Sequence, residues 1–109
     1  MGTQAVVSVQ CKQTDQVLMK IITGMDGQEA SRLARQLRSR WPMSIEDVYR
    51  LALLMFDCPE SLVVMTQERA IHDEDQGPLD ARYLSTFDRP EFNPRWECGL
   101  ADFTEIVRV

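Results

Sequence analysis

Cysteine and histidine side chains are the residues of this chain best suited to bind a metal or attack a substrate. They are Cys11, Cys58, His72 and Cys98. Structural zinc sites usually take their ligands in close pairs along the sequence, because each pair holds the local backbone before the long loop closes. No two of these residues are that close, although folding is free to bring them together. The spacing therefore predicts no metal site.

A catalytic thiol or hydroxyl needs a base within hydrogen-bond reach and a third group that orients the base. His72 is the only histidine, and acidic residues follow it at 73–75, which is typical of a solvated loop. The chain also lacks the Gly-x-Ser-x-Gly pattern of a hydrolase nucleophile. The sequence therefore predicts no catalytic residue and no cofactor.

A glycine-containing turn followed by arginines is the best candidate site for a small anion. Gly24 and Gly27 lie between an expected strand and an expected helix, where free backbone amides attract phosphate. Arg32 and Arg35 follow on the helix as natural partners of the anion. However, a helix cap at Asp26 would use the same amides. Both common phosphate-loop motifs are absent, so we expect turn geometry to explain the glycines.

The densest group of interface-forming residue types lies in residues 83–103. Five of the eight aromatic residues fall there, and two prolines bar the segment from regular strand pairing. Because aromatic and arginine side chains concentrate binding energy at protein interfaces, we expect this segment to contact a partner. The expected contact residues are Arg89, Phe92, Arg95 and Trp96. Alternatively, Phe92 and Trp96 pack onto the chain's own core, since small domains rarely leave such large apolar groups exposed.

Arginines on the first expected helix raise the question of DNA binding. They are Arg32, Arg35, Arg38 and Arg40. A helix-turn-helix motif inserts its second helix into the major groove, so that helix must expose a polar face. Here the second helix is the apolar one, and the chain has a formal net charge of −5. We therefore do not expect a nucleic-acid partner, and we interpret the arginines as a solvated face that is also available to a protein.

The composition is that of a single globular domain spanning residues 1–109. Hydrophobic residues make up 44% and charged residues 27%, which are ordinary values. The longest apolar run, residues 51–56, is far shorter than the roughly 18 residues of a membrane span. No signal peptide is visible, and three widely separated cysteines favour reduced thiols. We therefore expect a cytoplasmic protein with no membrane contact.

The first half of the sequence predicts a hairpin followed by two helices. Residues 4–12 and 17–23 have the alternating and β-branched patterns of paired strands. Asp26 is the expected N-cap of a helix that ends near Trp41, because the residue before a proline is disfavoured in helical geometry. Ser44 is the expected N-cap of a second helix, which stops before the Cys-Pro pair and is apolar nearly all round in its second half. We therefore expect that half to be buried on more than one side.

The second half predicts two strands separated by irregular segments. Residues 62–65 form a continuous apolar run that suits an internal strand covered on both faces. Residues 70–80 are acidic and contain a Gly-Pro break, which is typical of a surface loop. The aromatic segment follows, and residues 103–109 are the last expected strand.

These elements predict an α+β domain with two layers, in the order β-β-α-α-β-(irregular)-β. A mostly antiparallel sheet would be backed by two consecutive helices. If the third strand runs parallel to the second, the helices form its right-handed crossover. Otherwise the helices form a separate hairpin.

The functional expectation is a non-enzymatic module for protein–protein interaction or homo-oligomerisation. The alternative is a protein or enzyme that binds an anion or nucleotide in a pocket between the sheet and the helices.

Overall fold

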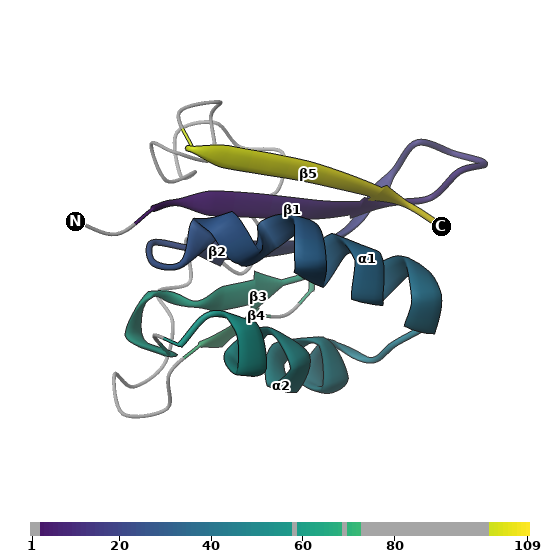
Figure 1. Cartoon of the computed structure of the whole chain (residues 1–109). Coiled ribbons are helices and arrows are strands. Elements are labelled where there is room, and N and C mark those ends of the chain that lie inside the picture. Colours follow the sequence, from purple (N-terminus) through teal and green to yellow (C-terminus); the bar gives the residue numbers. More distant parts are fainter. Residues whose placement is uncertain (1–2, 58, 69, 73–100) are drawn as a thin grey trace.

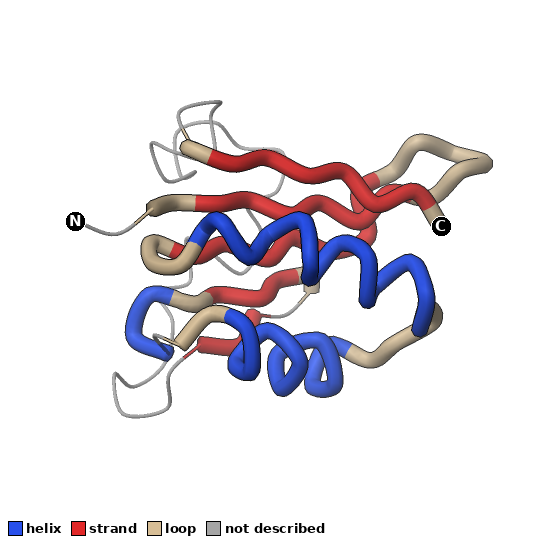
Figure 2. The backbone as a smooth tube through the Cα atoms, in the orientation of Figure 1, coloured by secondary structure: helices blue, strands red, loops and turns tan. Residues whose placement is uncertain are grey.

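In the part of the chain that the structure describes, a five-stranded mixed sheet carries two helices on one face (Figures 1 and 2). In this computed structural model, the residues described are 3–57, 59–68, 70–72 and 101–109. The strands are β1 (Ala5–Gln10), β2 (Val17–Thr23), β3 (Val63–Met65), β4 (Ala70–His72) and β5 (Phe103–Arg108). The helices are α1 (Ala30–Arg40) and α2 (Ile45–Met55), with short 3-10 turns η1 (Gly27–Glu29) and η2 (Pro59–Ser61). The predicted α+β class and the two-layer arrangement are confirmed.

The order of strands across the sheet is β4-β3-β2-β1-β5, and only the β1–β5 pair is parallel among the described strands. The predicted hairpin of β1 and β2 is therefore present. Strand β3 runs antiparallel to β2, so the helices are not a crossover between parallel strands. The two helices run in opposite directions and return the chain to the end of the sheet where β2 finished. Strand β3 therefore starts at that end and runs antiparallel to β2.

The two helix starts differ in how well they match the sequence pattern. Ser44 caps α2 as expected, since its hydroxyl accepts a hydrogen bond of 3.2 Å from the Asp47 amide. Asp26 is not the N-cap that we expected for α1. Its φ of 59° is left-handed, its side chain makes no capping bond, and η1 precedes the helix. An N-cap needs extended backbone to aim its side chain at the first turn.

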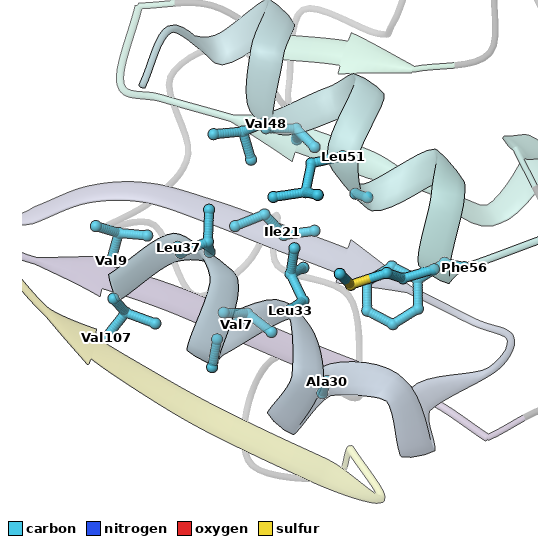
Figure 3. Close-up of a cluster of buried hydrophobic side chains, with 14 of the residues drawn as sticks. Val7, Val9, Ile21, Ala30, Leu33, Leu37, Val48, Leu51, Phe56 and Val107 are labelled. Atoms are coloured by element: carbon cyan, nitrogen blue, oxygen red, sulfur yellow. The ribbon is translucent and has the colours of Figure 1, made fainter. Parts of the chain in front are cut away.

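The core lies between the helices and the sheet. Side chains from α1, α2 and four strands are buried there, including Val7, Val9, Ile21, Leu33, Leu37, Leu51, Phe56, Val64 and Val107 (Figure 3). Val6, Ile22 and Met65 form a smaller cluster on the opposite face of the sheet. Strand β3 contributes Val64 to the first cluster and Met65 to the second, so its predicted covering on both faces is confirmed.

One further expectation is wrong in part, and another holds with one exception. Residues 70–72 do not belong to a surface loop but form β4, which pairs antiparallel with β3, because β3 offers unpaired backbone groups that a short return can use. Residues 73–80 lie outside the described residues. The second half of α2 is buried on more than one side, as expected, since Leu51, Ala52, Met55 and Phe56 are buried and Leu53 packs partly buried against the core. The exception is Leu54, which is 82% exposed.

Candidate interaction surface

The residues that we expected to contact a partner, Arg89, Phe92, Arg95 and Trp96, lie outside the described residues. Their role therefore stays a prediction. Phe103, at the end of the same segment, is the first residue of β5 and is 40% exposed.

The cysteines and the histidine are described only in part. Cys58 and Cys98 lie outside the described residues, and His72 lies in β4. Cys11 is a half-buried free thiol just after β1, and hydrogen bonds from the side chain and backbone of Thr14 lower its pKa. In the described part of the chain, no group of three or more His, Cys, Asp and Glu side chains is placed to hold a metal.

The candidate anion turn uses its amides within the chain. The amide of Gly27 donates to the Thr3 carbonyl at 3.0 Å, and that of Met25 donates to the Thr23 hydroxyl at 3.2 Å. The carboxylate of Asp26 accepts a hydrogen bond of 3.1 Å from the Asp57 amide. These bonds leave few donors for phosphate and place a carboxylate beside them, so the geometry favours a structural role for the turn.

The glycines and arginines of the candidate anion turn also have separate structural roles. A Cβ on Gly27 would lie 2.8 Å from the Gln4 carbonyl oxygen, so close backbone approach explains this glycine, whereas a Cβ on Gly24 would make only ordinary contact. Arg32 pairs with Glu29 at 3.6 Å, and Arg35 is exposed on the outer face of α1.

The space between the sheet and the helices is filled by core side chains in the described part of the chain (Figure 3). Phe56, Ile21, Leu33 and Leu37 are among the largest, and each is less than 2% exposed. A ligand pocket at that interface would have to displace them. The described core therefore lends no support to the alternative of a small-molecule site between the layers.

A groove of about 420 Å³ lies instead on the outer surface, where α1 ends and α2 begins. Its lining residues are Arg40, Pro42, Met43, Asp47, Arg50, Leu51 and Leu54. Leu51 is buried, Met43 is half-buried, and Leu54 is the most exposed large apolar side chain among the described residues. The groove thus has an apolar floor and one apolar side chain open to water.

Arginines border this groove. Arg50 makes an exposed ion pair of 3.5 Å with Asp47, whereas Arg40 has no ion-pair partner within the described ranges. The stretch from residue 30 to residue 50 holds five arginines against two acidic residues, in a chain whose net charge is −5. The helix layer is therefore basic on an otherwise acidic protein.

Local sequence accounts for the shape of the groove. Helix α1 ends at Arg40 because Trp41 is held extended before Pro42, and Ser44 starts α2 a few residues later. Asp47, Arg50 and Leu54 recur at the three- and four-residue spacing that places them on one stripe of α2. Because Asp47 and Arg50 are charged, their stripe indicates from the sequence that Leu54 is on the exposed side of α2.

Neither described helix is long and apolar enough to span a membrane. Comparison with known proteins finds no match to this chain among protein-family models, curated proteins or solved structures.

Proposed function

We propose that this protein is a non-enzymatic protein–protein interaction module, and that the groove between the end of α1 and the start of α2 holds a segment of its partner. The observation that carries the proposal is Leu54, which is 82% exposed beside the apolar floor of that groove. Binding energy at interfaces concentrates where an apolar centre is ringed by residues that exclude water. Arginine is enriched in such surroundings.

The partner segment should present a large apolar side chain flanked by carboxylates. The apolar side chain would cover Leu54 and Met43, and the carboxylates would meet Arg40 and Arg50 at the rim. Opposite charge at a rim raises the association rate and selects among partners more than it adds affinity. We therefore expect salt to slow association while leaving a residual apolar affinity.

The proposal also includes the contacts expected at Arg89, Phe92, Arg95 and Trp96, self-association of the chain, and a cytoplasmic location. None of these depends on the groove. The small-ligand alternative is not proposed, because the described turn and core give it no support.

A photo-reactive amino acid placed at position 54 tests the groove directly in cells that naturally express the protein. We expect one discrete cross-linked protein, and we expect its yield to fall when Arg40→Glu and Arg50→Glu are added. The matched control carries the same amino acid at position 18, because Leu18 is a partly exposed leucine, 36% exposed, on β2 and outside the groove.

Purified partner and protein then give the affinity by titration calorimetry. Leu54→Asp should weaken binding about tenfold or more, as removal of a central apolar contact does. Leu18→Asp should leave it unchanged. Equal cross-linking from positions 54 and 18, or equal affinity of both aspartate variants, would refute the groove as the binding site.

A further inference from the structure

The outer edge of β5 exposes a row of backbone groups. Strand β5 is the last strand of the sheet on the side of β1, and it forms the upper border in Figure 1. The Phe103 amide donates to the carbonyl of Gln4, just before β1, and the Val109 amide donates to the carbonyl of Gln10, the last residue of β1. Because backbone groups alternate along a strand, those of Thr104, Ile106 and Arg108 point away from β1.

Only one of these outward groups has a partner within the described residues. The guanidinium of Arg38 donates a 3.0 Å hydrogen bond to the Ile106 carbonyl. The Ile106 amide and both backbone groups of Thr104 and Arg108 have none in that part of the chain. An edge with free donors and acceptors is a template for another strand.

The side chains on this edge are also partly apolar. Ile106 is 50% exposed on the sheet face opposite the helices, and Phe103 is 40% exposed on the helix face. Natural edge strands often carry charged residues or proline to discourage pairing. Strand β5 does contain the charged residues Glu105 and Arg108, but Ile106, whose backbone groups point outward at the middle of the edge, is neither charged nor proline.

We propose that β5 pairs antiparallel with β5 of a second copy of this chain, about a two-fold axis at Ile106. The hydrogen bonds of the new ladder form only where residues whose backbone groups point away from β1 lie opposite one another. With Ile106 opposite itself, Thr104 faces Arg108 of the second copy, and the ladder spans residues 103–109 of both strands. This pairing joins the two sheets and places both helix layers on the same face.

The neighbouring registers are worse. A shift of two residues in one direction sets Glu105 opposite Glu105 of the second copy, and like charges directly opposite are destabilising. A shift in the other direction pairs only residues 105–109. The register centred on Ile106 is therefore the one that uses the whole strand without opposing like charges.

Charge complementarity across the axis supports the same register. Glu105 lies on the helix face of β5, where its partner across the β1 ladder is Val7, and it is half-buried. Arg38 reaches the edge from that face. Neither residue has an ion-pair partner among the described residues. In the pair of copies, Glu105 of each lies beside Arg38 of the other, so the Glu105–Arg38 pair occurs twice, as a two-fold interface requires.

Arg38 need not leave the Ile106 carbonyl, because a carbonyl oxygen accepts two hydrogen bonds. This pairing gives a surface to the self-association that the proposed function includes, and that surface is separate from the groove at Leu54. Partner binding in the groove and pairing through β5 can therefore fail independently.

Sedimentation equilibrium of the full chain tests the association. We expect a dimer that dissociates on dilution, and we expect Ile106→Pro to weaken it at least about tenfold, since proline removes the central amide of the ladder. That amide points away from β1, so the variant keeps every bond between β5 and β1. Ile106→Val keeps the amide and should remain a dimer.

Cysteine cross-linking tests the register even if Ile106→Pro fails to fold. In a Cys98→Ser background, Ile106→Cys should form a disulfide with its own copy, because antiparallel partners lie within the Cα separation that a disulfide spans. Thr104→Cys alone should not, whereas a mixture of Thr104→Cys and Arg108→Cys should. Mass mapping identifies the bond in the tryptic peptide that begins at residue 96 and ends at residue 108, or at residue 109 where Arg108 is replaced.

A chain that stays monomeric up to about 1 mM would overturn the proposal. So would a dimer that cross-links no better through position 106 than through position 104. A dimer that Ile106→Pro leaves intact in a folded variant would show that another surface is used, and would overturn it as well.

Discussion

The turns at Asp26 and Ser44 both precede helices. Each has a residue of a type that often caps helices, followed by an acidic residue three positions later, yet the two side chains bind different parts of the molecule. Ser44 binds its own helix through the Asp47 amide. Asp26 instead binds the amide of Asp57, beyond the end of α2. One turn thus satisfies a local rule, and the other joins two segments that are far apart in sequence.

The reason for the difference is the position of each turn in the fold. The turn at Asp26 lies against the residues that precede β1. The Gly27 amide donates to the Thr3 carbonyl there, and this close backbone approach leaves no room for a side chain at position 27. The turn at Ser44 connects two helices near the groove, where no strand of the described residues hydrogen-bonds to its backbone. In this protein the capping hydrogen bond forms at the turn where no tertiary contact fixes the backbone in another conformation.

The largest expected effect comes from filling the close contact at Gly27. Gly27→Ala should destabilise the protein by about 3 kcal/mol, because its Cβ would meet backbone atoms that cannot turn aside as a side chain can. Gly24→Ala is the matched control and should cost under about 1 kcal/mol, since its Cβ would lie 3.4 Å from Ser61. Urea unfolding followed by circular dichroism measures both. Equal losses would mean that the turn at Asp26 is no more constrained than an ordinary one.

Removal of the Asp26 side chain should have the next largest effect. Asp26→Ala should cost about 2 kcal/mol, because it deletes the hydrogen bond to Asp57 and forces alanine into a left-handed conformation. Asp26→Gly loses only the hydrogen bond and should cost about half as much. Hydrogen exchange should quicken at the Asp57 amide in both variants. Faster exchange confined to the first turn of α1 would show that Asp26 is a helix cap after all.

Ser44→Ala should have a smaller and strictly local effect. Loss of the cap should cost about 1 kcal/mol and should speed hydrogen exchange at the Asp47 amide. Ser44→Asp, which keeps an acceptor, serves as the control and should preserve protection. Faster exchange at Asp57 in Ser44→Ala would mean that the two turns are coupled.

The smallest effect is expected for Asp47→Asn. The ion pair of Asp47 with Arg50 is exposed, and such pairs contribute at most about 1 kcal/mol. We therefore expect a loss of about 0.5 kcal/mol, which includes the loss of the negative charge in the first turn of α2. Thermal unfolding in low and high salt measures it, and salt should reduce the difference. A loss as large as that of Ser44→Ala would give the groove rim a structural role as well.

Much of this architecture was predictable because it depends on short-range patterns. Alternation identified the β1–β2 hairpin, the proline after Trp41 ended α1, and Ser44 started α2. The apolar run at residues 62–65 indicated a strand covered on both sides. Each of these features is decided within a few residues, so neighbouring side chains carry enough information.

The candidate surfaces were less predictable because they depend on which side of an element the rest of the chain covers. Leu54 belongs to the apolar half of α2, and its place on the charged stripe of Asp47 and Arg50 was a weak local signal until the packing of α2 left it exposed. Phe103 and Ile106 look like ordinary strand residues until β5 is known to be an edge.

The sequence by itself determined the kind and order of most elements, the α+β class and the start of α2, because propensity, capping and periodicity act locally. Only the tertiary structure decided that β5 lies parallel to β1 at the border of the sheet, that residues 70–72 form β4, and that Asp26 binds Asp57. These are contacts between residues distant in sequence. They are chosen by which burial and hydrogen bonding the whole chain can satisfy at once.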